Sequence, residues 1–149
     1  NAVGTFGGAI NGSGGLTVAG GTQTLSGANG YTGATSINAG TLALTGSGSL
    51  AASSGIVNDG TFDISGTTSG AAINALTGTG TVALGGRTLT LANAAGTFGG
   101  TINGSGGLTV AGGTQTLSGV NTYTGATMVD AGTLALSGAG QLASSTSVT

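Results

Sequence analysis

Few side chains in this sequence of 149 residues could do chemistry. It contains no histidine or cysteine, and its charged residues are three aspartates, Asp59, Asp63 and Asp130, and one basic residue, Arg87. Without imidazole or thiol groups the chain lacks the usual general base, a thiolate nucleophile and the ligands of a zinc cluster. One arginine cannot form the basic surface that binds nucleic acid. We therefore expect no catalytic residue, no cofactor, no metal site and no nucleic-acid partner.

Asp59 and Asp63 are close enough in sequence to suggest a carboxylate pair or a calcium site. Calcium-binding β-rolls, however, repeat an aspartate in every nonapeptide, and most glycine-rich turns of this sequence have none. We therefore interpret both aspartates as polar turn residues, and Asp130, which replaces Asn38 of an equivalent stretch, in the same way. Arg87 follows two glycines and is expected on the outside or beside a carboxylate.

Tyr31 and Tyr123 occupy equivalent positions in two copies of one repeat. They could form a surface that stacks on carbohydrate, and we name them as the candidate contact residues. In the alternative interpretation, both rings pack inside or cap the same corner of the fold.

Glycine-rich stretches and threonine pairs suggest two further kinds of site. Residues 12–15 have the composition of a phosphate loop, but no lysine follows and no helix is expected to receive a phosphate. Threonine pairs could form an ice-binding face, but they do not recur at one spacing, and the β propensity of threonine explains them better. The pairs are Thr22/Thr24, Thr79/Thr81, Thr88/Thr90 and Thr114/Thr116. We assign the asparagines to turns, where their side chains bond backbone groups in αL or Asx-type corners. They are Asn11, Asn29, Asn38, Asn58, Asn74, Asn103 and Asn121.

The elements that position these residues follow from internal repeats. Residues 1–53 recur at 93–145, and residues 11–27 return unchanged at 103–119. Such duplication is typical of a solenoid. We therefore predict a single β-solenoid segment over 1–149, made of a long repeat, 1–92, and a partial second copy, 93–149. We expect it to be an excerpt of a longer array.

A shorter period lies inside the long one. Gly-Thr dipeptides begin at Gly40, Gly60, Gly80 and Gly100, and each is followed by alternating apolar residues typical of a half-buried strand. The spacing predicts an all-β fold, a right-handed parallel β-helix with coils of about 20 residues and about seven coils in all. A sandwich or an antiparallel barrel does not explain the fixed spacing. The predicted inward residues are Leu42, Leu44, Phe62, Ile64, Val82, Leu84, Leu89, Leu91, Leu108, Val110, Leu134 and Leu136.

Two stretches resemble a known module. Residues 26–42, SGANGYTGATSINAGTL, and their second copy from residue 118 to 134 are similar to the autotransporter-associated β-strand repeat of bacterial passenger domains. The resemblance implies a large surface protein of a Gram-negative bacterium, secreted through a C-terminal outer-membrane barrel, and many such proteins are adhesins. It assigns no catalytic residues.

The resemblance and the lack of catalytic groups together predict a noncatalytic extracellular rod, a segment of an autotransporter-type adhesin. The alternative is a self-assembling extracellular fibre, because low charge and high β propensity favour association. A polysaccharide-active enzyme on a β-helix would need more clustered charged groups than this chain has. The expected partners are a host-cell or matrix surface or another copy, with membrane contact only through a barrel outside the segment. The expected location is the cell surface, anchored in the outer membrane, or the medium after secretion.

Overall fold

The computed structural model describes residues 2–143 and 147–149, and in these ranges it contains strands but no helix. The strands are β1 (Ala2–Phe6), β2 (Leu16–Val18), β3 (Gly21–Leu25), β4 (Thr35–Ile37), β5 (Thr41–Gly46), β6 (Ile56–Asn58), β7 (Thr61–Thr67), β8 (Ala71–Ile73), β9 (Leu76–Thr77), β10 (Thr81–Ala83), β11 (Leu89–Leu91), β12 (Ala94–Phe98), β13 (Thr101–Asn103), β14 (Leu108–Val110), β15 (Gly113–Leu117), β16 (Thr127–Val129) and β17 (Thr133–Leu136).

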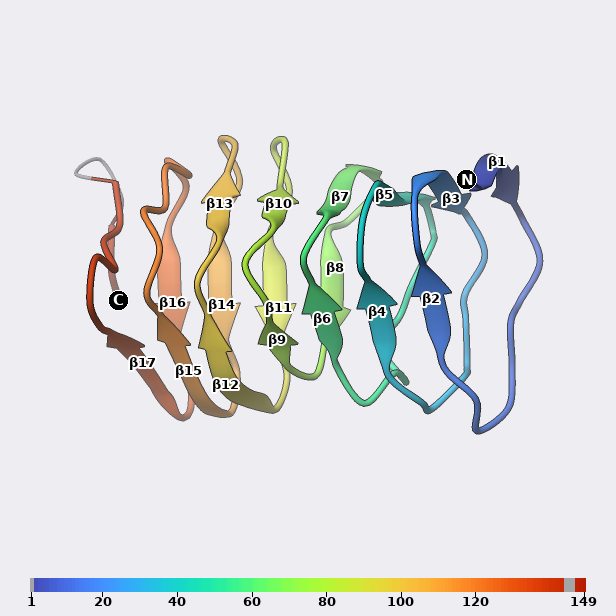
Figure 1. Ribbon diagram of the computed structural model, residues 1–149. Coiled ribbons are helices and arrows are strands. Elements are labelled where there is room, and N and C mark those ends of the chain that lie inside the picture. Colours follow the sequence, from blue (N-terminus) through green and yellow to red (C-terminus); the bar gives the residue numbers. More distant parts are fainter. Residues whose placement is uncertain (1, 144–146) are drawn as a thin grey trace.

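The strands line three sides of a continuous coil (Figure 1). Side one holds β1-β3-β5-β7-β10-β13, side two holds β8-β11-β14-β16, and side three holds β2-β4-β6-β9 and then β12-β15-β17. A parallel bridge between Gly78 and Phe98 joins the two groups of side three. Every strand pair is parallel, as stacking of successive coils requires.

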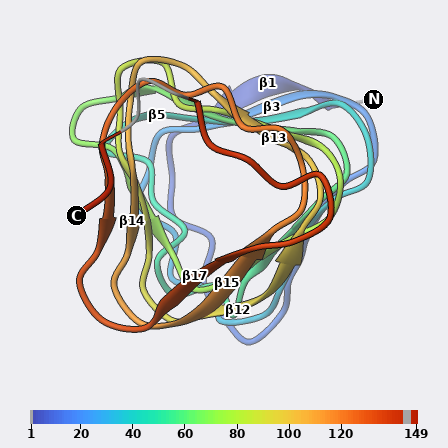
Figure 2. The ribbon, with the colours of Figure 1, turned by 90° about the vertical axis from the view of Figure 1, so that its left-hand side faces the viewer.

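The coil is right-handed. Figure 2 looks along the axis from the C-terminal end, and there the chain passes from β13 at the top through β14 at the left to β15 at the bottom. It therefore turns anticlockwise as it approaches the viewer. Partners on neighbouring coils are 18 residues apart at Ala71 and Leu89 and 21 apart at Thr35 and Ile56. The stack has about seven turns, so the predicted parallel β-helix is confirmed.

The core is a set of columns in which inward side chains follow one another along the axis. Leu42, Phe62, Val82 and Ile102 are in register on side one, and none is exposed. The predicted inward residues from Leu42 to Val110 are all buried. Leu136 also has the predicted inward phase, in register with the buried Leu117, but it is 49% exposed because β17 is the outermost strand on its side and no described strand covers its far face.

Glycine forms the corner before the strands of side one because the backbones approach one another closely there. A Cβ on Gly60 would lie 2.6 Å from the carbonyl oxygen of Gly40. A Cβ on Gly80 or Gly100 would collide with the carbonyl oxygen of the preceding glycine in this column. The corner therefore excludes any side chain, which accounts for the Gly-Thr dipeptide at each 20-residue step.

The two copies of the long repeat lie on different sides of the coil. β1, β3 and β5 belong to side one, whereas their equivalents β12, β15 and β17 belong to side three. From β1 the chain returns to side one at β3, β5, β7 and β10, which is four full coils, and then passes β11 on side two to reach β12. Each repeat therefore advances by four coils and two of the three sides.

Candidate functional surfaces

Asp59 and Asp63 each accept a hydrogen bond from a backbone N–H group. The backbone N–H and the hydroxyl of Thr79, in the following coil, donate to Asp59 Oδ1 at 2.9 and 3.1 Å. Asp63 Oδ1 accepts from the backbone N–H of Ser65 at 2.8 Å. Asp59 thus links its corner to the next coil, whereas the turn position predicted for Asp63 is wrong, because Asp63 lies within strand β7. In the part of the chain that the structure describes, no cluster of three acidic residues could hold a metal ion.

Arg87 lies at the surface beside the preceding coil. Its Nη1 donates to the carbonyl oxygen of Thr68 at 3.1 Å, and its side chain is partly exposed. The cation is therefore used as a hydrogen-bond donor between neighbouring coils. This agrees with the outward position predicted for it.

The structure corrects the candidate surface at Tyr31 and Tyr123. Tyr31 is 2% exposed and Tyr123 is fully buried, so neither ring has a free face for stacking on a sugar. Both turn inward from an irregular corner, as the packing interpretation expects. Their hydroxyl groups lie 2.6 Å from Thr35 Oγ1 and Thr127 Oγ1, respectively. Burial raises the pKa of both phenols above the ordinary value of 10.0, and the threonine hydrogen bond only partly opposes it.

Asn29 and Asn121 tie three coils together. Asn29 Oδ1 accepts from the backbone N–H of Ile10 at 3.0 Å in the preceding coil, and its Nδ2 donates to the carbonyl oxygen of Ser49 at 3.2 Å in the following one. Asn121 repeats the arrangement with Ile102 and Gln141. The predicted bonding of asparagine to backbone groups is confirmed here. No described residue other than glycine has a positive φ, so these corners do not use αL asparagine.

Sequence reasoning missed Gln23 and Gln115, which are the inward polar residues of β3 and β15. Gln115 is fully buried, and its Nε2 donates to the carbonyl oxygens of Leu76, Gly96 and Thr116 at 3.1, 3.3 and 3.1 Å. Its Oε1 is buried without a partner. The alternation in the sequence of residues 21–25, GTQTL, places the glutamine in the same phase as the inward leucine and could have revealed it.

The outward face of side one carries a row of threonines in register. Each follows a corner glycine, and the row runs through Thr22, Thr41, Thr61, Thr81 and Thr101. The next outward row is mixed, because Thr24 is followed in register by Ala43 and Asp63. The threonine pairs therefore do not stack into a continuous double row. The β propensity of threonine therefore remains the explanation of the threonine pairs.

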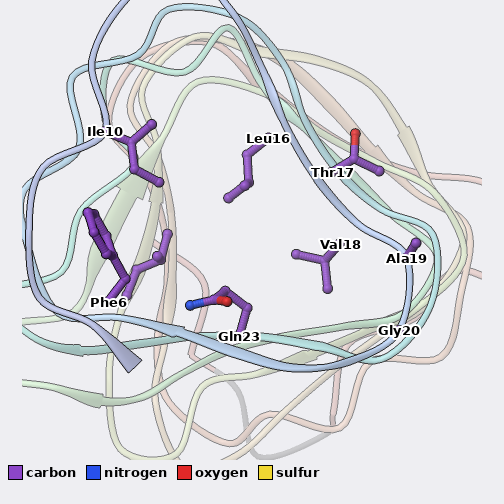
Figure 3. A pocket seen from close by; sticks show the side chains of 9 residues that line it. Phe6, Ile10, Leu16, Thr17, Val18, Ala19, Gly20 and Gln23 are labelled. Carbon is purple, nitrogen blue, oxygen red and sulfur yellow. The ribbon is translucent and has the colours of Figure 1, made fainter. Parts of the chain in front are cut away.

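The N-terminal end of the coil is hollow. Phe6, Ile10, Leu16, Val18 and Gln23 turn toward the interior and surround a hollow of about 560 Å³ (Figure 3). Phe6 is 43% exposed although it lies in a strand position whose equivalents are buried. The hollow is the open mouth of the first coil, since its lining residues come from β1, β2 and β3 and from the segments that join these strands.

The passenger-associated-transport-repeat family matches the chain at two places, residues 20–44 and 112–136. The chain carries two autotransporter passenger repeats. They include the stretches in which the sequence resembled that class, so the resemblance is confirmed. Each passenger repeat spans one coil and the strand that follows it, from β3 to β5 on side one and from β15 to β17 on side three.

No curated protein and no solved structure matches the chain. Residues 2–143 and 147–149 include no helix with the length and apolar character needed to cross a bilayer. Passenger repeats imply surface or extracellular exposure in a Gram-negative bacterium.

Proposed function

We propose that the chain is a noncatalytic segment of the extracellular rod of an autotransporter-type adhesin, and that it holds a binding element away from the cell. The observation that carries this proposal is the uninterrupted stack of coils around one apolar core, in a chain with passenger repeats. Each coil packs on the coils next to it, so a solenoid gains length in proportion to its residues. At about 4.8 Å for each coil, seven coils extend on the order of 35 Å.

The placement of the polar side chains supports a load-bearing role. Asn29 and Asn121 each bond to the coils on both sides. Gln115 bonds to the preceding coil and also to the coil before that one. These bonds run along the axis and resist separation of the coils. The four charged residues are few and scattered; Asp59 and Arg87 bond to the backbone of neighbouring coils, and Asp63 bonds to the backbone of its own strand. The chain thus has features of a spacer.

The proposal is tested in the natural full-length protein on intact cells. We expect an epitope inserted at the exposed Ser47 corner to be accessible to antibody on intact cells. Removing one 92-residue unit should shorten the projection and reduce attachment to a host matrix, while inserting a unit of unrelated solenoid of equal length should restore it. Attachment that survives removal, or is lost with the unrelated unit, contradicts the spacer role. An epitope reached only after lysis contradicts the extracellular position.

A self-assembling fibre is the second candidate, and the low charge of the chain favours it. A net charge of −2 provides little repulsion between copies. Electron microscopy of the purified chain at rising concentration distinguishes the candidates. Long uniform filaments support the fibre, and short rods at every concentration support the spacer.

A further inference from the structure

The long repeat shows the same residues in two settings. Ile102, Leu108 and Phe98 are fully buried in the second copy. Their equivalents in the first copy, 92 positions earlier, are Ile10, Leu16 and Phe6, and each of these is partly exposed. Since the residue types are identical, the difference comes from what lies on the N-terminal side of each copy. The second copy therefore shows which kind of coil can cover the open N-terminal end of the first copy.

The second copy is covered by residues 74–92, which we call the covering coil. Its inward side chains are fully buried; they are Leu76, Val82, Leu84, Leu89 and Leu91. Its backbone pairs with the second copy on all three sides. β10 is in register with β13, β11 with β14, and the N–H of Gly99 donates to the carbonyl oxygen of Gly78 at 2.8 Å.

Gln23 lacks one hydrogen bond that its equivalent makes to the covering coil. Gln115 Nε2 donates to the carbonyl oxygens of Gly96 and Thr116 and also to that of Leu76 in the covering coil. Gln23 Nε2 donates to Gly4 and Thr24, the counterparts of the first two acceptors, at 3.2 and 3.1 Å. The counterpart of Leu76 is the missing acceptor, and the amide already faces the hollow where it would lie (Figure 3).

The backbone of residues 9–11 also differs from that of its equivalent, residues 101–103. Residues 101–103 form β13 because they pair with β10 of the covering coil. Residues 9–11 share the Ile-Asn sequence of that strand but form no strand, and no strand of the described chain lies on their N-terminal side. Side-chain exposure, the glutamine amide and strand formation therefore all distinguish the two copies, and all three depend on the covering coil.

We propose that the open N-terminal end is an interface for a coil with the sequence of residues 74–92, contributed by another unit of the same long repeat. Relative to residues 74–92, the added coil is displaced by one side around the axis. This is the displacement of the first copy relative to the second, since an advance of two of the three sides equals a return by one. Its counterpart of β10 then pairs with residues 9–11, its counterpart of β11 with β2, and its counterpart of Gly78 with Phe6. Three such units bring equivalent strands back to the same side, so the repeats present each outward feature in three directions around the rod. The interface does not depend on the adhesive role.

The experiment adds a second copy of residues 74–92 directly before residue 1 of the full chain. Amide hydrogen exchange is compared between residues 2–18 and their equivalents 94–110. We expect exchange at residues 9–11 and in β1 and β2 to slow by roughly tenfold or more, towards the rates of β13, β12 and β14. The matched control carries the same extension with its five inward leucine and valine residues replaced by serine, and it should give no protection.

A second part of the experiment distinguishes a coil that comes from a separate chain from one that belongs to the same chain. A free peptide of residues 74–92 is titrated into the unextended chain, and the same amides are followed. Protection by the peptide assigns the interface to units of separate chains as well, whereas protection by the extension alone assigns it to consecutive units of one chain. The proposal is overturned if neither arm protects residues 9–11, or if the serine control protects them equally. Surface exposure and attachment on cells are unaffected by either result, so the rod proposal fails or stands separately.

Discussion

Gln115 lies in register with Gly96 of the preceding coil, and its side-chain amide reaches beyond that glycine to the carbonyl oxygen of Leu76, two coils back. Gly96 has a φ of +98°, a conformation that other residues rarely adopt, and a Cβ at this position would meet Thr77 Cγ2. A polar side chain thus links three coils through an otherwise apolar core.

Replacing Gly96 with alanine is the first prediction. The new Cβ would lie 2.7 Å from Thr77 Cγ2 at a positive φ, so the unfolding free energy should fall by about 1–3 kcal/mol. The equivalent Gly4→Ala is the control, because nothing lies within 4 Å of a Cβ at Gly4 and its φ is not in the positive range. Urea denaturation of both variants measures the difference. Equal losses would show that the strain assigned to Gly96 is absent.

Asn121→Ala should be strongly destabilising, because Asn121 is buried at its corner. The change removes bonds to the coils before and after it and leaves the buried N–H of Ile102 without an acceptor, which together cost about 2–4 kcal/mol. Asn38→Ala is the matched control, since Asn38 is exposed and its side chain makes no hydrogen bond, and it should change stability by less than about 0.5 kcal/mol. Thermal unfolding of both variants checks the contrast. Similar midpoints would contradict the role given to Asn121.

The alternating pattern predicted the coil period and most inward residues because a strand places every second side chain on one face. Tyr31 and Tyr123 were not predictable in this way, since they lie in irregular corners where no alternation fixes the direction of a side chain. The shift of the second copy to another side follows from the two periods, because 92 residues are not a whole number of coils of about 20 residues. The side that it reaches was not predictable, since partners on successive coils lie 18 to 21 residues apart.

Alkaline pH should destabilise the protein through the two buried tyrosines. Burial raises the pKa of Tyr31 and Tyr123 in the folded state above 10.0, whereas the unfolded chain keeps the ordinary value. The stabilisation is therefore complete below pH 10 and is lost as the pH rises through the folded pKa values. The chain has no lysine, cysteine or histidine, so no other side chain titrates between neutral pH and this range. Denaturation series from neutral to alkaline pH measure the loss.

The control for this pH dependence is the double variant Tyr31→Phe with Tyr123→Phe. It should be less stable at neutral pH by about 1 kcal/mol for each lost hydroxyl hydrogen bond. Its stability should then stay nearly constant over the alkaline range in which the parent protein loses stability. An equally steep alkaline loss in the double variant would assign the effect to other groups.

Calcium should leave the stability unchanged. Asp59 and Asp63 each use one carboxylate oxygen to accept a backbone hydrogen bond, Asp59 from the following coil and Asp63 from its own strand, and the described chain holds no third acidic ligand beside them. An ion that bound the folded state would raise the unfolding midpoint in proportion to the logarithm of its concentration. Scans with millimolar calcium and with a chelator should therefore coincide. A rise with calcium that disappears in Asp63→Asn would restore the metal-site interpretation.

Truncation of the equivalent phenylalanines should have unequal effects. Phe98 is fully buried beneath the covering coil, so Phe98→Ala should cost about 3–5 kcal/mol of stability. Phe6 is 43% exposed, and Phe6→Ala should cost less than half as much because much of its surface is already in water. In the chain extended by a second copy of residues 74–92, the cost of Phe6→Ala should rise towards that of Phe98→Ala. Urea denaturation measures this coupling in Phe98→Ala, in Phe6→Ala, and in the extended chain with and without Phe6→Ala. An unchanged cost at Phe6 would show that the added coil does not cover the open end.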